Sequence, residues 1–314
     1  MKLFHWLIIG ALALVLASCG GTPIPAKPNV AAKPISSNLN GTTATAKRNG
    51  IRGNAKGITT LMGFGRLFKA GAPLTQMLSQ VLPQLTQTQV MAATKSIGLA
   101  KGNMQLQAAS GCLSGTISSP ISRSTDADGD GIPVEVLVLF SNCVLDLGAT
   151  PNPVLNGAIY IKDGNDASAT SSYTVIIDLT ISNGADSIKL GLGVDYSAPA
   201  TIGGAHGFNF VIQLKSTTAG VVSEVGVAFN STFQPTTGTD PFGNGTLNFT
   251  GTYAETAGAD SYSFNLTGTN LGIATSCDDF NAGTLRVADA DSFFQVNYTS
   301  CGHGTYTGDT TGTF

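Results

Sequence analysis

Apolar and polar residues alternate along most of the chain from about Gly98 to Phe314. Each run presents one apolar face, and the intervening residues are mostly Ser, Thr, Asn, Asp, Lys and Gly. A period of two is typical of half-buried β-strands. The clearest runs are Tyr173–Ile181, Ile188–Tyr196, Phe208–Leu214, Val225–Phe233, Leu247–Tyr253, Tyr262–Leu266, Leu285–Val287 and Phe294–Tyr298. Short turns such as Ser182–Asp186 separate them, so successive strands are predicted to pair as hairpins.

A helical pattern precedes this region, within residues 57–97. Its apolar positions have the i, i+3, i+4, i+7 spacing of one helical stripe: Leu74, Met77, Leu78, Val81, Leu82 and Leu85. Pro83 lies inside the stripe and is expected to kink or divide the helix, because proline lacks an N–H and clashes with the preceding turn. The stripe is predicted to belong to the core and not to contact a membrane.

A long meander with one apolar face must hide that face from water. The sequence therefore predicts an all-β fold over residues 98–314. We expect an antiparallel meander that forms a strongly curved sheet or barrel-like domain, with the N-terminal amphipathic helix packed against its concave apolar side. In outline this is similar to the periplasmic lipoprotein-carrier proteins, whose half-open barrel binds acyl chains under a helical lid. The similarity concerns the fold alone.

The first residues have the pattern of an export signal. Lys2 precedes an apolar run from Leu7 to Leu16, which is too short to span a membrane as a stable helix. The run ends in Leu16-Ala17-Ser18-Cys19, which resembles the lipobox of bacterial lipoproteins. The resemblance implies that residues 1–18 are removed and that acyl chains such as palmitate on Cys19 anchor the protein to a membrane. The alternative is an ordinary secretory signal followed by a chance cysteine.

The residue after the cysteine bears on the membrane that is chosen. In Gram-negative lipoproteins, Asp at this position usually retains the protein at the inner membrane. Here the residue is Gly20. The resemblance therefore favours the outer membrane over the inner membrane.

Composition and charge divide the chain into two parts. Only 11% of the residues are charged and 39 are Gly, which suits a secreted all-β protein with many turns. Between Cys19 and Thr125 there are eleven Lys or Arg and no Asp or Glu, whereas from Asp126 onward there are four basic and nineteen acidic residues. The formal charges of the two parts are thus +11 and −15.

Residues 19–56 are rich in Pro, Ala, Asn, Thr and Gly and have no periodic apolar pattern. They are predicted to form a lipidated, flexible, basic tether. Its charge suits an anionic envelope surface. The alternative is a solvated tether whose charge simply complements the acidic domain. An exported chain is not expected to bind nucleic acid.

Four cysteines follow Cys19, and an even number in an exported chain predicts two disulfides with three possible connectivities. Hairpin geometry selects one of them. A turn near Ala127 and a second turn near Asp289 each place two cysteines opposite one another. The predicted disulfides are Cys112–Cys143 and Cys277–Cys301. With a structural partner for every thiol, no catalytic cysteine is expected.

The first of these turns contains the sharpest chemical signal of the chain. Asp126, Asp128 and Asp130 occupy alternate positions and are followed by Gly131. This spacing resembles the start of a calcium loop of the thrombospondin type 3, dockerin or EF-hand kind. The resemblance implies that the three carboxylates and the carbonyl of Ile132 hold a structural Ca²⁺.

The loop departs from the EF-hand pattern beyond this point. Leu137 stands where a bidentate Glu is expected, and Glu135 comes two positions earlier. The residues after Pro133 alternate in the manner of a strand and not of an exiting helix. The alternative interpretation is an acidic hairpin loop without a metal.

No catalytic constellation is predicted, so the protein is expected not to be an enzyme. Its two histidines beyond the signal, His206 and His303, lie in Gly-flanked turns or strand starts and are expected to be solvated. Three functions remain open: a non-catalytic structural or interaction lipoprotein, a carrier for lipid or another apolar ligand, and an outer-membrane β-barrel pore. The lack of Trp beyond Trp6 counts against the pore, because membrane barrels have aromatic girdles.

Overall fold

The computed structural model describes residues 24–29, 112–128, 132–144, 151–167, 172–236, 243–257, 260–277, 279–288, 293–308 and 311–313. The predicted signal peptide, Cys19 and the predicted helical segment 57–97 lie outside these residues. Among the residues that are described, no helix is long and apolar enough to cross a membrane.

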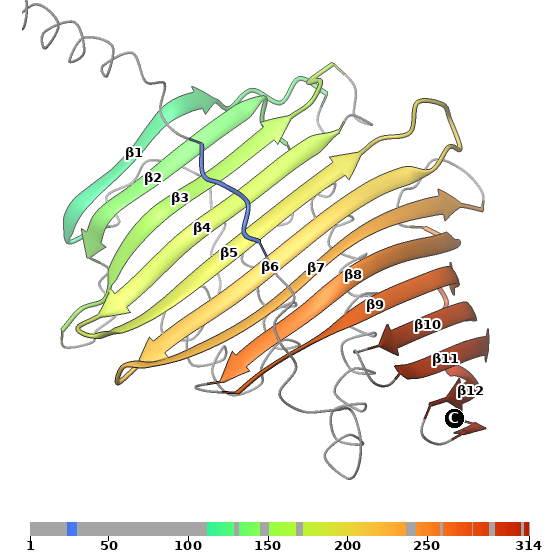
Figure 1. The fold of residues 1–314 in the computed structure, drawn as a ribbon. Coiled ribbons are helices and arrows are strands. Elements are labelled where there is room, and N and C mark those ends of the chain that lie inside the picture. Colours follow the sequence, from blue (N-terminus) through green and yellow to red (C-terminus); the bar gives the residue numbers. More distant parts are fainter. Residues whose placement is uncertain are drawn as a thin grey trace, which may run out of the picture.

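Thirteen antiparallel strands form a single sheet in sequence order (Figure 1). The strands are β1 (Ser114–Arg123), β2 (Glu135–Val144), β3 (Val154–Asp163), β4 (Tyr173–Asn183), β5 (Asp186–Ser197), β6 (His206–Thr218), β7 (Val221–Pro235), β8 (Gly245–Ala257), β9 (Asp260–Ile273), β10 (Ala282–Ala288), β11 (Phe293–Ser300), β12 (His303–Thr307) and β13 (Gly312–Thr313). Each strand pairs with its neighbours along the chain. The predicted all-β antiparallel meander is therefore confirmed.

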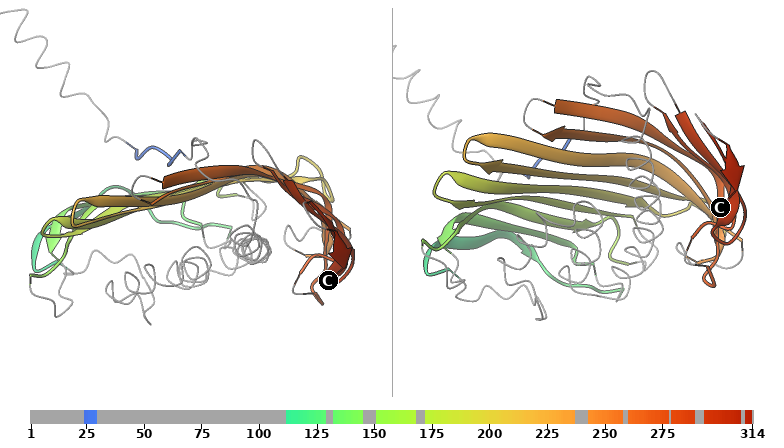
Figure 2. Two further views of the ribbon diagram at one scale, coloured as in Figure 1. Left: turned by 60° about the horizontal axis from the view of Figure 1, so that its bottom comes forward. Right: turned by 90° about the horizontal axis from the view of Figure 1, so that it is seen from below.

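The sheet is bent, and its two edges do not meet (Figure 2). Within the described part of the chain, β1 pairs only with β2 and β13 pairs only with β12. Of the two predicted shapes, the structure is an open curved sheet and not a closed barrel. The helix expected on the concave side falls on residues outside the described ranges.

Tight turns set the register of the central hairpins. Asn183 pairs with Asp186 between β4 and β5, which leaves a two-residue loop in which Gly184 has φ +64°. Thr218 pairs with Val221 between β6 and β7, and both intervening residues have positive φ. Two-residue loops of this kind match the twist of antiparallel strands. The turn predicted within Ser182–Asp186 is confirmed.

The concave face of the sheet carries the main apolar core. In β5, Val194 and Tyr196 belong to this core, whereas Asp195 contacts the segment that lies on the convex side (Figure 2). Successive side chains of a strand point to opposite faces, so the alternation seen in the sequence separates the two sides. Along the strands, the core extends from Ile159 in β3 to Tyr298 in β11.

A smaller apolar cluster lies on the convex face at the β2–β4 end of the sheet. Its buried members are Leu137, Ala158, Tyr160 and Ile176. The Tyr160 hydroxyl donates a hydrogen bond to Glu135 Oε1 at 2.9 Å, and Glu135 also forms an ion pair with Arg123. Burial raises the pKa of Tyr160, and the positive charge of Arg123 opposes that rise. This end of the sheet is therefore apolar on both faces.

Both predicted disulfides are present. Cys112 is linked to Cys143 with a Cα–Cα distance of 5.1 Å, and Cys277 is linked to Cys301 with a Cα–Cα distance of 5.7 Å. The hairpins that suggested these pairs are β1–β2 and β10–β11, in which Arg123 pairs with Glu135 and Ala288 with Phe293. Each disulfide therefore ties together chain segments near one end of the meander.

Candidate functional site

Three carboxylates gather at one end of the sheet. Asp126 and Asp128 lie in the loop between β1 and β2, and Asp166 lies in the loop between β3 and β4. One oxygen from each lies within 4.8 Å of the other two. We refer to these three residues as the acidic cluster.

Backbone hydrogen bonds hold the two loops together. The amide of Ala127 donates to Asp166 Oδ1 at 2.9 Å. At the base of the first loop, the Val134 amide donates to the Thr125 carbonyl at 3.0 Å. The Asp163 amide donates to the carbonyls of Pro133 and Val134, at 3.3 and 3.2 Å. These hydrogen bonds join the two loops to each other without the help of a ligand.

The second loop has its own local structure. The amide of Asn165 donates to Asp163 Oδ1 at 3.2 Å, and the amide of Ala167 donates to Asn165 Oδ1 at 3.3 Å. Such side-chain to backbone bonds are typical of Asx turns. These turns direct the chain so that Asp166 reaches the β1–β2 loop.

The structure brings only part of the predicted calcium site together. The carboxylates of Asp126 and Asp128 lie close together, whereas Asp130 lies outside the described residues. The Ile132 side chain is 3% exposed and belongs to the main core, so only its backbone carbonyl is available to the loop. Asp166 was not predicted from the sequence.

A signal for Asp166 nevertheless exists in the sequence. Asp163-Gly164-Asn165-Asp166 is a second cluster of turn residues with carboxylates. In an antiparallel meander, alternate loops lie at the same end of the sheet, so the β1–β2 and β3–β4 loops are neighbours. Searching for acidic turns separated by two strands would have found this residue.

The donor set of the acidic cluster fits a hard cation. Oxygens bound to one Ca²⁺ at about 2.3–2.6 Å lie within about 5 Å of each other. Three carboxylates at this spacing repel one another unless a cation lies between them. Backbone carbonyls and water usually complete the six to eight oxygen ligands that Ca²⁺ takes. The arrangement can therefore hold calcium.

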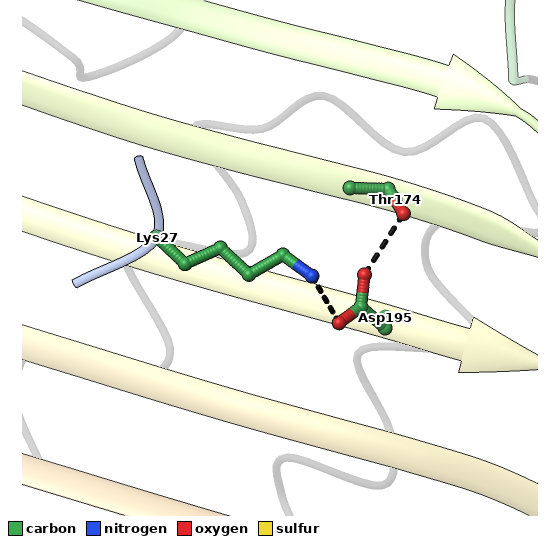
Figure 3. Close-up of polar contacts among 3 residues, drawn as sticks. All are labelled: Lys27, Thr174 and Asp195. Atoms are coloured by element: carbon green, nitrogen blue, oxygen red, sulfur yellow. Dashed lines mark hydrogen bonds and ion pairs between the residues drawn. The ribbon is translucent and has the colours of Figure 1, made fainter. Parts of the chain in front are cut away.

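Six residues of the predicted tether lie on the convex face, and we call this segment, Ile24–Asn29, the strap. The Lys27 ammonium forms an ion pair with Asp195 of β5 (Figure 3). The other oxygen of Asp195 accepts a hydrogen bond from the Thr174 hydroxyl of β4 at 2.8 Å (Figure 3). The carbonyl of Asn29 accepts a hydrogen bond from Gln213 Nε2 of β6 at 3.5 Å. The rest of the tether lies outside the described ranges.

The two histidines differ from each other in environment. His303 is exposed, as expected. His206 is 4% exposed, so the expectation that it is solvated is wrong. Its Nδ1 lies 2.7 Å from the Tyr196 hydroxyl, and burial raises the pKa of Tyr196 to about 12. His206 begins β6 on the core side of the sheet, where a polar pair with Tyr196 and the nearby Phe233 ring hold it.

Comparisons with known proteins identify no relative of this chain. No family model matches it, and no curated protein or solved structure matches it significantly. Its function must therefore be argued from its own residues.

Proposed function

We propose that this protein is a bacterial envelope lipoprotein, anchored by acyl chains on Cys19, with a non-catalytic structural or interaction role. The observation that carries the proposal is Leu16-Ala17-Ser18-Cys19 at the end of an apolar export signal. Gly20 favours the outer membrane as the destination. The folded part is then a disulfide-stabilised β-domain presented at a membrane surface.

The two disulfides of the fold support export. Disulfides persist in oxidising compartments and are rare in reducing ones. All four cysteines beyond Cys19 are used in disulfides. Cys143 is fully buried, so its disulfide forms part of the interior of the domain.

We further propose that the helical segment 57–97 covers the concave face. A sheet with an apolar face needs a second layer to exclude water. The stripe from Leu74 to Leu85 supplies an apolar surface of the right kind.

The size of the concave core favours a second candidate function, a carrier for lipid or another apolar ligand. That core spans nine strands, from β3 to β11. If the helical layer left part of it uncovered, acyl chains could bind there. Lipid that co-purifies with the Cys19→Ala protein would favour the carrier over the structural role.

The acidic cluster supports a structural calcium site, which we include in the proposal. Bound Ca²⁺ would join the β1–β2 loop to the β3–β4 loop through Asp126, Asp128 and Asp166, with Asp130 and the Ile132 carbonyl as further ligands. The role that we propose for it is stabilisation, because it would join two loops of the sheet.

Calcium at millimolar concentration is expected to raise the melting temperature of the Cys19→Ala protein, because a ligand that binds only the folded state stabilises it. Asp166→Asn should remove most of this increase, since it replaces one of the three carboxylates. Asp186→Asn, in the β4–β5 turn, is the matched control and should keep it. Differential scanning calorimetry with calcium and with a chelator measures this increase in the parent protein and in both variants. Equal melting temperatures in the two conditions would show that the cluster is only a turn.

The anchor is tested by fractionation of cells that produce the full chain. The wild-type protein should sediment with the membranes and dissolve only in detergent. Cys19→Ala removes the acyl acceptor, so the variant should be soluble in the envelope contents or remain an uncleaved precursor. Ala17→Ser, which keeps a small residue before the cysteine, is the control and should stay in the membrane fraction. Cys19→Ala protein that has lost its signal peptide and still sediments with the membranes would contradict lipid anchoring.

A further inference from the structure

The strap fits the sheet through two glycines of β5. A Cβ on Gly191 would lie 2.8 Å from the Pro28 Cβ. A Cβ on Gly193 would lie 2.8 Å from Val211 Cγ1 of the next strand and 3.2 Å from the Lys27 Cγ. Neither glycine has a positive φ, so the backbone of the strand does not require glycine at either position. Glycine within a strand often marks the close approach of another segment. The convex face is thus shaped for the strap at these two positions.

Charge fixes the strap beside the glycines. Lys27 pairs with Asp195, which is oriented by Thr174 on the next strand (Figure 3). Side chains of both residues are partly exposed, at 39% for Lys27 and 28% for Asp195. Exposed ion pairs contribute little alone. Steric fit and charge therefore act together to hold the strap in one place.

The strap lies close to the proposed lipid anchor in sequence. Ile24 follows Cys19 by five residues, which extend over at most about 17 Å. Thirteen strands at about 4.8 Å spacing make a sheet about 58 Å wide. A lipid on Cys19 must therefore enter the bilayer close to the convex face, on which the strap lies (Figure 2).

The convex face next to the strap is polar. A groove of about 540 Å³ borders Lys27 and crosses β5 to β9. One row of cross-strand partners runs along it: Asp195, Asn209, Asn230, Thr250 and Thr267. Amide and hydroxyl groups donate and accept hydrogen bonds, which suits the phosphate, glycerol and amine groups of lipid heads. The convex side of the groove is mostly polar and also carries the apolar side chains of Val211 and Ala228, which suits a face that lies on a membrane and does not insert into it.

We propose that the strap orients the domain, so that the convex face of β5–β9 rests on phospholipid headgroups and the concave face points away from the membrane. The inference rests on the proposed lipidation of Cys19. It adds to that proposal an interaction surface, the convex groove, and a partner, the headgroup layer of the anchoring membrane.

The orientation is tested with the full lipidated protein in vesicles of phosphatidylethanolamine and phosphatidylglycerol. A fluorophore is attached at Asn230→Cys in the groove or, as the matched control, at Thr201→Cys in the β5–β6 loop. Both positions are exposed. Lipids with a nitroxide on the headgroup should quench the Asn230 label at least threefold more strongly than the Thr201 label.

Variants that release the strap should abolish this difference. Lys27→Asp places like charges together, and Gly191→Gln fills the space below Pro28. The exchange of charges in Lys27→Asp with Asp195→Lys should restore strong quenching, which separates loss of docking from misfolding. Equal quenching at both labels in a wild-type protein that is bound to the vesicles would overturn the proposed orientation. A protein that carries no lipid and does not bind vesicles would instead contradict the proposed function.

Discussion

Replacing Cys143 and Cys301 with alanine together is expected to lower the free energy of unfolding by about 7 kcal/mol. The disulfides join residues 31 and 24 positions apart, and on the chain-entropy estimate each contributes about 3.5 kcal/mol. They lie near opposite ends of the meander, so their effects should add. A typical domain is stable by about 5–15 kcal/mol, so the double variant should lose about half or more of its stability.

Urea unfolding of the Cys19→Ala protein, followed by circular dichroism, measures each loss. Cys143→Ala and Cys301→Ala should each lower the stability by about half of the combined loss. Reduction of the parent protein with dithiothreitol is the control and should give the same result as the double variant. Single variants that lose less than about 1 kcal/mol would show that the chain-entropy argument does not apply to these loops.

Phe249→Ala is expected to lower the free energy of unfolding by about 3–5 kcal/mol, because it leaves a cavity in the main core. Phe249 is 3% exposed, and its ring centroid lies 6.2 Å from that of Phe229. Across β8 and β9 it pairs with Gly268, where a Cβ would overlap the Phe249 ring. The Phe249 ring and the Leu271 side chain fill the space that this glycine leaves.

Thr250→Ala is the matched control for this prediction. Thr250 follows Phe249 in β8, is exposed, and lies in the polar row of the convex face. Its replacement should change the stability by no more than about 0.5 kcal/mol. Thermal or urea unfolding of both variants compares the two faces of one strand directly. Similar losses for both would contradict the assignment of the core to the concave face.

The sequence was most informative where one face of a strand is buried and the other is solvated. In β5 to β11 this condition produces clean alternation, and the eight predicted runs correspond to β4 to β11. β3 was missed because Tyr160 and Ala158 are buried on the convex face, while Leu155 and Ile159 are buried on the other. A strand buried on both faces loses its period of two.

The candidate site was predictable only in part, for a topological reason. The spacing of Asp126 and Asp128 is visible within one loop, whereas Asp166 joins them only because two loops lie at the same end of the sheet. The burial of His206 depends on Tyr196, a partner on the preceding strand. Contacts between strands are set by register, which the local pattern does not contain.

The docking of the strap could not be predicted from its composition. Pro, Ala and Lys in residues 24–29 are equally compatible with a solvated tether. Its position depends on Gly191, Gly193 and Asp195, more than 160 residues away. Glycine in the middle of an apolar strand was the available signal, and it indicates a close approach without identifying the segment that approaches.

The most direct test of lipid anchoring is mass spectrometry of the N-terminal peptide from protein purified out of the envelope. We expect a peptide that begins at Cys19, with the added mass of a diacylglycerol on sulfur. A peptide that begins elsewhere, or an unmodified Cys19, would contradict it.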